Sequence, residues 1–530
     1  MVSQPVKNNC PKQATIETDC LIIGAGLAGS AYSILAAEAG LSCVLISAGA
    51  SIDNANSDWA QGGIIYAPPE RPDGLRKDIF EASGKTANPK AINNLVNHGA
   101  DIIKSFLIDE LNVPFDRDDS GNLKFTREGG HSKARIIYSK DRTGHHILEA
   151  VHNRLRGIPA IDFRPEYTAV DLLTPSHHSE NLSDKYGDLS CIGAYVLERK
   201  TGEVLTVKAR KTVLATGGVG QIFERTTNQP GIVGSGIAMA YRIGARVMDL
   251  EYIQFHPTVF HRKNCPPFLI SEAVRGEGGV LINKNGEAFM DDIHPLGSLA
   301  PRDIIARAIH RELFEKKTDC VYIDLAGVDP DYVRTRFPNI YSQCRSYGVD
   351  ITREPVPVSP AAHYLCGGIY TDLKGRTTIR NLNAIGETAC TGLHGANRLA
   401  STSLLECLTA AKLTIQQDAK EIRRRKVSMP EVRQWEDNTL QGDPVLLEQD
   451  MNLIRKTLWN YAGIVRSRKR LERAKKVLWE IKEAVDETYR THRLSGALLY
   501  LRDASQTALL VVYAASRNPT SAGCHYIIDD

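Results

Sequence analysis

A glycine-rich turn near the start of the chain limits the possible fold more than any other feature. Residues 19–23 form a short apolar run, Gly24-Ala25-Gly26-Leu27-Ala28-Gly29 follows at once, and an alanine-rich stretch continues to about Gly40. A second apolar run occupies residues 42–46. Strand, glycine turn, helix and strand in this order predict a βαβ unit with parallel strands. The chain is therefore predicted to build a layered α/β domain.

The three glycines of this turn suit a dinucleotide site. Gly24 allows a tight turn, Gly26 lets the backbone approach a pyrophosphate, and Gly29 lets the helix pack close to the sheet. The helix N-terminus offers free N–H groups to phosphate oxygens. The second strand, however, ends in Ser47-Ala48, where an NAD site has an acid for the ribose. NAD is therefore a less suitable ligand.

Two later strand ends favour FAD. Residues 211–215 end in Thr216-Gly217-Gly218, and residues 383–386 end at Glu387, whose carboxylate can accept hydrogen bonds from ribityl or ribose hydroxyls. Residues 401–406 have the spacing of a capping box at a helix start. The positive end of that helix would stabilise negative charge on a reduced flavin. Each feature alone is also a common structural device, but their combination and order indicate FAD.

The length of 530 residues exceeds the usual size of one domain. The nucleotide-binding segments are spread along most of the chain, so we expect a Rossmann-like α/β FAD-binding domain in two parts, residues 1–249 and 365–428. Residues 250–364 are rich in His, Pro, Gly and Arg and would form an inserted α+β capping domain that carries the substrate site. Residues 429–530 contain helix-period apolar positions and are predicted to form a C-terminal helical bundle.

Composition argues against several other classes of protein. The 65 basic and 62 acidic residues give a formal net charge of +3, which is too even to indicate nucleic-acid or membrane binding. The eleven cysteines include no CxxC pair and no Cys/His zinc pattern, so we expect reduced thiols and no metal site. The first fifteen residues are polar and lack an apolar signal core, which favours the cytoplasm, although a short organellar transit peptide stays open.

Motifs beyond the nucleotide site resemble those of the succinate dehydrogenase/fumarate reductase flavoprotein superfamily. Residues 59–64 (WAQGGI) resemble its AQGG element, and residues 254–258 are its QFHPT motif; further matches are residues 272–278 (EAVRGEG), 301–303 (PRD), 362–364 (AHY) and 395–399 (GANRL). The resemblance runs from about residue 18 to residue 520. It implies an FAD cofactor contacted, besides the glycine turn, by Ser47, Asn56, Ser57, Ala60, Gln61, Gly62, Gly63, Gly217, Gly218, Ser235, Glu387, Ser403 and Leu404.

The resemblance also implies four-carbon dicarboxylate substrates. A pocket for them needs cations or hydrogen-bond donors aimed at two carboxylates, and the residues that match the superfamily's carboxylate binders are His256, Ser271, His363 and Arg398. The planar guanidinium of arginine suits bidentate pairing with a carboxylate. Ser271 stands where the superfamily commonly has threonine, so the hydroxyl is kept. Taken alone, each histidine is better read as a structural residue, but both lie near prolines or glycines in the predicted insertion, which favours a position in a cleft.

Arg302 matches the proton-transfer arginine of the superfamily. The resemblance implies a relay from Arg302 through Glu272 and Arg275, which are three residues apart on one predicted helical face. An arginine base is unusual because the pKa of arginine in water is above about 12. A purely structural ion network of the same three residues is the alternative.

Residues 126–132 (TREGGHS) distinguish two families within the superfamily. They resemble the REGGHS of L-aspartate oxidases, whereas succinate dehydrogenase flavoproteins usually have another residue in place of Glu128. L-Aspartate carries an α-ammonium group that succinate lacks, and the carboxylate of Glu128 would favour that cation. An exposed loop charge is the alternative reading of Glu128.

The resemblance implies oxidation of L-aspartate to iminoaspartate, with oxygen reduced to hydrogen peroxide or fumarate reduced to succinate. The imine would feed quinolinate synthase and NAD biosynthesis. A soluble fumarate reductase or succinate dehydrogenase flavoprotein is the alternative enzyme. A non-catalytic FAD-domain protein is the alternative from another class, but it would be expected to lack the dispersed polar residues His256, Arg302, His363 and Arg398.

Three positions depart from common patterns of the superfamily. The histidine that binds flavin covalently in membrane-complex succinate dehydrogenases aligns with Asn56, which implies non-covalent FAD. Ser47-Ala48 replaces a common Ser-Lys, and Gly234-Ser235-Gly236 replaces a common Gly-Asp-Gly. Both replacements concern cofactor contacts, so we expect FAD to be held in a partly different way.

Overall fold

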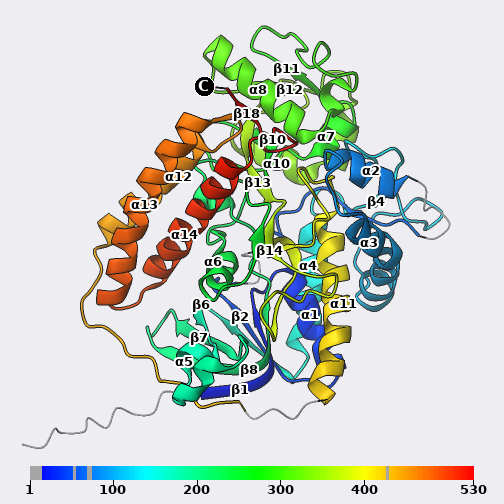
Figure 1. Cartoon of the computed structure of the whole chain (residues 1–530). Coiled ribbons are helices and arrows are strands. Elements are labelled where there is room, and N and C mark those ends of the chain that lie inside the picture. The colour runs from blue at the N-terminus through cyan, green and yellow to red at the C-terminus, as the bar shows by residue number, and fades with distance from the viewer. Residues whose placement is uncertain (1–14, 52–54, 69–73, 425–428, 530) are drawn as a thin grey trace, which may run out of the picture.

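The computed structural model describes residues 15–51, 55–68, 74–424 and 429–529 (Figure 1). A seven-stranded sheet in the order β5-β2-β1-β8-β7-β6, with β15 also paired to β8, forms the base of the molecule. The parallel strands are β1 (Thr15–Ile23), β2 (Cys43–Ser47), β5 (Ile161–Pro165), β8 (Val204–Leu214) and β15 (Leu382–Ala384). Strands β6 (Tyr167–Leu172) and β7 (Gly193–Glu198) continue the sheet in antiparallel pairing.

The predicted βαβ unit is present as β1, α1 (Leu27–Glu38) and β2. Alternate residues of β1 enter different cores because side chains of a strand point to opposite faces. Ile22 packs with α1 and α11 (Ser403–Arg424), whereas Leu21 packs toward the C-terminal helices. All four strands expected from the sequence pair in this one sheet, so their carboxyl ends meet at one edge.

A second, antiparallel sheet lies above that edge. Its order is β10 (Ile253–Phe260), β13 (Val356–Leu365), β12 (Val321–Asp324) and β11 (Val280–Ile282). Helices α7 (Glu272–Gly276), α8 (Arg302–Lys316), α9 (Pro330–Arg336) and α10 (Pro338–Ser346) share its separate hydrophobic core. These elements fall almost entirely within residues 250–364, while the domain boundaries themselves stay a prediction.

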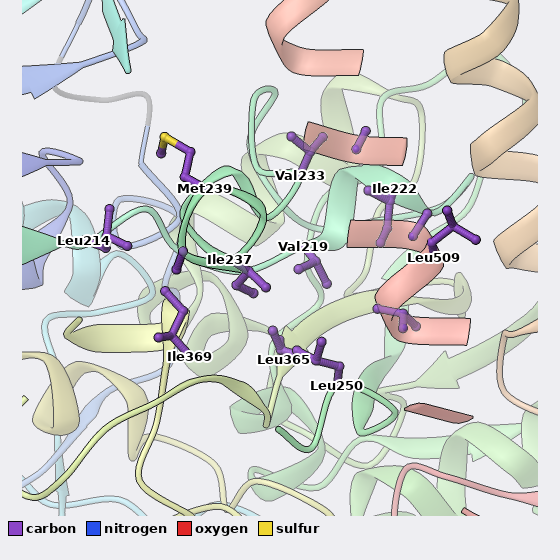
Figure 2. Close-up of a cluster of buried hydrophobic side chains, with 14 of the residues drawn as sticks. Leu214, Val219, Ile222, Val233, Ile237, Met239, Leu250, Leu365, Ile369 and Leu509 are labelled. Atoms are coloured by element: carbon purple, nitrogen blue, oxygen red, sulfur yellow. The ribbon is translucent and has the colours of Figure 1, made fainter. Parts of the chain in front are cut away.

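Three long C-terminal helices pack along one side of the molecule (Figure 1). They are α12 (Pro444–Tyr461), α13 (Arg468–Thr491) and α14 (Gly496–Arg517). Leu509 of α14 lies near Val219, Ile222 and Val233, in the cluster that also contains Leu214 at the end of β8 (Figure 2). Helix α14 and the main sheet therefore share one core. Among the described residues, no helix combines the length and apolarity needed to cross a bilayer.

Smaller elements complete the chain. Strands β9 (Val247–Met248), β14 (Gly368–Tyr370) and β16 (Ala389–Cys390) form a three-stranded sheet, and two pairs are β3 (Ile64–Ile65) with β4 (Ile136–Ile137) and β17 (Arg466–Ser467) with β18 (Ile527–Ile528). The remaining α-helices are α2 (Leu75–Ala82), α3 (Pro89–Ile102), α4 (Thr143–Arg156), α5 (Pro175–His178) and α6 (Ser235–Arg242). The first fourteen residues, on which the expected location depends, lie outside the described part.

Candidate active site

A cavity of about 1050 Å³ lies between the carboxyl edge of the main sheet, the antiparallel sheet and α14. Most residues that the sequence predicted for the cofactor line it: Gly24, Ala25, Gly26, Leu27, Ala28, Ser47, Asn56, Ser57, Ala60, Gln61, Gly62, Gly63, Gly217, Ser235, Glu387, Ser403 and Leu404. The predicted substrate and proton-transfer residues that line it are Glu128, His256, Ser271, Glu272, Arg302, His363 and Arg398. Gly29, Gly218 and Arg275 are predicted site residues that lie behind this lining.

The glycines of the first turn are of two kinds: two are packed against neighbouring backbone, and one has space beside it. Gly24 has φ +112°, and a Cβ there would overlap the carbonyl group of Ala215. A Cβ on Gly29 would overlap the Gly24 carbonyl oxygen, so these two glycines let α1 approach the sheet. At Gly26 the nearest atom to such a Cβ is Ser57 Oγ at 3.7 Å, and the residue faces the cavity. Gly26 is thus the position where a pyrophosphate can come closest to the backbone.

The AQGG segment is held against neighbouring strands. Thr143 Oγ1 donates to the Gly62 carbonyl oxygen at 2.6 Å, and a Cβ on Gly63 would overlap Ile137 of β4. Asn56 Oδ1 accepts from the Gln229 N–H at 2.9 Å, while Asn56 Nδ2 is buried without a hydrogen-bond partner among the described residues. The segment therefore presents fixed backbone and an unused amide donor to the cavity.

Glu387 lies at the end of β15 and faces the cavity. Its Oε1 accepts from the Leu365 N–H at 2.9 Å, and burial raises the pKa of Glu387 to about 7. A Cβ on Gly218 would overlap this carboxylate, which explains glycine at a position that lies behind the lining. The carboxylate can accept hydrogen bonds from hydroxyl groups of a ligand.

The helix start predicted at residues 401–406 is present, but the predicted capping box is wrong. Helix α11 begins at Ser403, and the Glu406 carboxylate accepts instead from Tyr364 Oη at 3.1 Å and contacts His394 Nε2 at 2.8 Å. Both partners come from distant segments, so the short-range spacing could not reveal them. Ser403 Oγ accepts from Arg398 Nη1 at 2.8 Å and thereby positions that guanidinium.

Two histidines lie ring to ring, with centroids 5.1 Å apart. His256 Nδ1 accepts from the Thr258 N–H at 3.2 Å, which assigns the proton to Nε2; this Nε2 is buried and has no partner in the described structure. His363 Nε2 accepts from Arg398 Nη2 at 3.1 Å, so His363 Nδ1 carries the proton toward Thr227 Oγ1 at 2.7 Å. Burial, and then the Arg302 guanidinium, lower the pKa of both histidines well below the ordinary value, so both are neutral.

Arg302, the first residue of α8, is fixed by two neighbours. Its Nε donates to Glu272 Oε2 at 2.6 Å, and its Nη1 donates to Gln254 Oε1 at 3.0 Å. Arg275 Nη2 lies 3.9 Å from the same Glu272 oxygen. The guanidinium groups of Arg302 and Arg275 lower the pKa of Glu272 despite its burial, so this carboxylate stays ionised. The structure thus brings the three predicted residues together.

Gln254 and Tyr364 are site residues to which sequence reasoning assigned no role. Gln254 Nε2 donates to Asn397 Oδ1 at 2.7 Å and to the Arg398 carbonyl oxygen at 2.8 Å, which turns its amide oxygen toward Arg302. Arg398 lies over the Tyr364 ring, 4.2 Å from its centroid. Gln254 belongs to the QFHPT motif and Tyr364 to the AHY motif, so the motifs were the sequence signal that could have indicated a role for these residues.

Glu128 is buried, with 3% exposure, so the reading as an exposed loop charge is wrong. Its Oε2 accepts from Ser401 Oγ at 2.7 Å. A Cβ on Gly62 would lie 2.5 Å from its Oε1, which places the carboxylate directly beside the AQGG segment. Burial, and then the nearby Glu272 carboxylate, raise the pKa of Glu128. A cation bound in the cavity would reverse that effect.

Several buried polar atoms around the cavity have no hydrogen-bond partner among the described residues: Asn56 Nδ2, Gln61 Oε1, His256 Nε2, Ser271 Oγ and Arg398 Nε. Because buried polar groups in proteins are nearly always paired, such a group of atoms indicates a ligand. The glycine turn at residues 24–29, the Asn56 amide and the Glu387 carboxylate fit a flavin dinucleotide. The donors of His256, Ser271 and Arg398 fit carboxylates.

Comparison with known proteins identifies a family and structural relatives. The family model described as "FAD binding domain" matches residues 19–404. The chain is 40% identical to L-aspartate oxidase 1 of Ralstonia nicotianae, with 96% of this chain and 95% of the relative covered. It is 39% identical to L-aspartate oxidase of Pseudomonas aeruginosa over the same shares. Among solved structures, E. coli quinol fumarate reductase FrdA superposes with a TM-score of 0.85 at 26% identity, covering 97% of this chain and 92% of that one.

Proposed function

Because the chain belongs to the L-aspartate oxidase family of FAD-dependent oxidoreductases, we propose that its cavity binds L-aspartate beside non-covalently held FAD and that the enzyme oxidises it to iminoaspartate. The reduced enzyme would be reoxidised by oxygen, which gives hydrogen peroxide, or by fumarate, which gives succinate. Iminoaspartate would serve quinolinate synthase and hence NAD biosynthesis.

Unpaired hydrogen-bond donors beside a buried carboxylate support L-aspartate as the substrate. The donors His256 Nε2–H, Ser271 O–H and Arg398 Nε–H are buried, face one cavity and have no hydrogen-bond partner in the described chain, and the buried Glu128 carboxylate lines the same cavity. Unpaired donors suit two carboxylates, and a carboxylate suits an ammonium group. L-Aspartate carries both kinds of group, whereas succinate would leave Glu128 without a cation.

We assign the substrate contacts as follows. His256, Ser271 and Arg398 hold the carboxylates, with His363 fixing the Arg398 guanidinium at 3.1 Å and Tyr364 stacking on it. The neutral state of the two histidines leaves N–H groups as donors without adding positive charge. Glu128 accepts the α-ammonium group and selects against a third carboxylate in its position.

FAD supplies, when bound, the acceptor for the hydride that leaves the substrate Cα. Arg302 relays the accompanying proton, which leaves the α-ammonium nitrogen. Its Nε–H, held by the ionised Glu272, passes a proton to that carboxylate, and its Nη2, which Gln254 and Glu272 leave free for the substrate, takes the substrate proton in exchange. Glu272 is 2.6 Å from Arg302 and receives the proton in turn. Arg275 stabilises the ionised form of Glu272 from behind the lining. The antiparallel sheet with its helices covers this group and keeps water away.

The direct test is an aerobic peroxide assay on the purified protein. L-Aspartate should yield hydrogen peroxide and succinate should not. Anaerobically, aspartate should bleach the flavin faster than succinate, and the opposite order would favour the second candidate, a fumarate reductase or succinate dehydrogenase flavoprotein, whose fold this chain shares. Flavin that remains with acid-precipitated protein would contradict non-covalent binding.

A further inference from the structure

Helix α14 forms part of the wall of the cavity. Gly496, Ala497, Tyr500 and Asp503 line it, and the spacing of Gly496, Tyr500 and Asp503 places them along one helical face. Helix α14 packs on α6, where Thr507 Oγ1 donates to the Gly234 carbonyl oxygen at 3.2 Å. The C-terminal helices, to which the sequence assigned no site residue, therefore reach the same cavity as the glycine turn.

Asp503 is a buried carboxylate on this wall. Its side chain is 4% exposed, and its Oδ1 accepts from Arg242 Nη1 at 2.9 Å. Burial raises the pKa of Asp503, an effect that Arg242 opposes most strongly. The Ser235 side chain also favours the ionised form of this carboxylate, and Ser235 lines the same cavity. An acidic side chain from α14 thus stands beside the serine of the Gly234-Ser235-Gly236 turn.

We infer that Asp503 is a cofactor-binding residue that accepts a hydrogen bond from a sugar hydroxyl of FAD, in place of the carboxylate missing at Ser235. A common Gly-Asp-Gly turn carries that carboxylate in the turn itself, whereas here the turn carries a hydroxyl and α14 brings the acid to it. A carboxylate repels phosphate, so the hydroxyl-bearing ribityl chain or ribose is its partner. The inference rests on the FAD site of the proposed function.

Asp171 provides a control on the same arginine. Arg242 Nε donates to Asp171 Oδ1 at 2.9 Å, so both carboxylates neutralise the same guanidinium. Asp171, however, is absent from the cavity lining in the part of the chain that the structure describes. Asp171 also pairs with Arg502 at 2.8 Å and accepts from Tyr489 Oη at 2.8 Å, so Asp171→Asn removes more charge pairing than Asp503→Asn does. Only Asp503→Asn removes a carboxylate of a residue that lines the cavity.

The experiment measures FAD dissociation constants of the full-length apoprotein by flavin fluorescence. Asp503→Asn should weaken FAD binding on the order of tenfold, as expected for one hydrogen bond to a charged acceptor. Asp171→Asn should change the constant less than about twofold, because it leaves that hydrogen bond in place. The double variant S235D/D503N, which returns the acid to the turn, should regain most of the affinity. Titrations with the fragments FMN and ADP then show which sugar is involved. FMN contains the ribityl chain and ADP contains the ribose, so Asp503→Asn should weaken binding of the fragment whose sugar contacts residue 503.

Three results would overturn the inference. They are equal losses of affinity in Asp503→Asn and Asp171→Asn, wild-type affinity in Asp503→Asn, and no recovery in the double variant. A wild-type protein that binds no FAD would overturn the proposed function as well, so the two failures are distinguishable. Melting temperatures of the apoproteins report folding separately from cofactor affinity.

Discussion

Three glutamates at the cavity, of which Glu128 and Glu272 are buried and Glu387 is half-buried, differ in their ionisation because their neighbours differ. Glu272 touches two guanidinium groups, and its pKa is lowered. Glu128 lies near Glu272 and has a raised pKa, while burial raises that of Glu387 to about 7. Burial, a nearby charge of the same sign and a nearby charge of the opposite sign therefore shift the pKa values of neighbouring glutamates in different directions. Their distribution supports an ion-pair role for Glu272, a cation-accepting role for Glu128 and a hydroxyl-accepting role for Glu387.

Glu128→Gln tests the role assigned to Glu128. The variant should lower kcat/KM for L-aspartate by about 10- to 100-fold, because an amide attracts an ammonium group less than a carboxylate does. Fumarate reduction should change less than about threefold, since fumarate carries no ammonium group. Steady-state kinetics with both substrates check this, with the exposed Asp119→Asn as control. Equal losses for aspartate and fumarate would remove Glu128 from its role.

Arg302→Leu tests the proton acceptor. The variant should keep the yellow absorbance of bound FAD but lose at least about 10³-fold in the rate of anaerobic flavin bleaching by aspartate, since a positioned acid or base contributes roughly this much. Gln254→Leu, which removes one support of the guanidinium, should give a smaller loss. Stopped-flow absorbance measures both rates. Wild-type bleaching in Arg302→Leu would refute the assignment.

Glu387→Gln should change the pH dependence of apoprotein stability. A carboxyl whose folded pKa is raised from 4.5 to about 7 stabilises the fold below pH 4.5, and that contribution is lost as the pH rises through 7. The neutral amide avoids this loss, so the variant should be more stable than the wild type at pH 8 by up to roughly 3 kcal/mol. At pH 4.5 the difference should be small. Urea unfolding at the two pH values measures it, and a constant difference would contradict the assignment.

Strand β10 shows how a secondary-structure element directs side chains toward Arg302 and Arg398. All of its residues are buried, and its pairing with β13 is interrupted between Gln254 and Phe255 and again between His256 and Val259. Such bulges redirect side chains and accommodate a proline that lacks an N–H donor. Gln254 and His256 both reach the Arg302–Arg398 region as a result.

The short β3–β4 pair is expected to tolerate no side chain at Gly63. A Cβ there would overlap the backbone of Ile137, so Gly63→Ala should lower the free energy of unfolding by about 2 kcal/mol or more and weaken FAD binding. Gly327→Ala is the matched control because a Cβ at Gly327 meets no atom within 4 Å. Chemical denaturation and FAD titration measure both variants. Similar behaviour of the two would show that β3 can shift to make room.

The elements that could be predicted from the sequence were those with local patterns. The strands that end at Ile23, Ser47 and Leu214 were visible because apolar runs stop at glycine turns or small residues. The prediction of a capping box was wrong because the Glu406 carboxylate contacts Tyr364 and His394 instead. No rule based on the spacing of a capping box relates these two residues to Glu406. Gln254 was missed as a support of Arg302 because its other partners lie more than 140 residues away. Asp503 was missed because its neighbour Arg242 comes from another part of the chain.

The core in Figure 2 joins the C-terminal helices to the nucleotide-binding sheet. Leu509→Ala should lower the free energy of unfolding by about 2–5 kcal/mol, since it leaves a cavity in this core. Release of FAD and loss of helicity should then occur in one transition at lower denaturant concentration. Leu446→Ala on the exposed side of α12 should leave the midpoint unchanged. Separate transitions for flavin and helix would show that α14 unfolds independently.

The placement of α14 on the cavity wall has a consequence for biogenesis. Strand β1 is synthesised long before α14, yet both border the cavity proposed for the cofactor. A nascent chain that is still attached to the ribosome, with α14 inside the exit tunnel, has an incomplete binding site. Tight uptake of the flavin should therefore wait until α14 has left the exit tunnel, and chains truncated before Gly496 should accumulate as apoprotein.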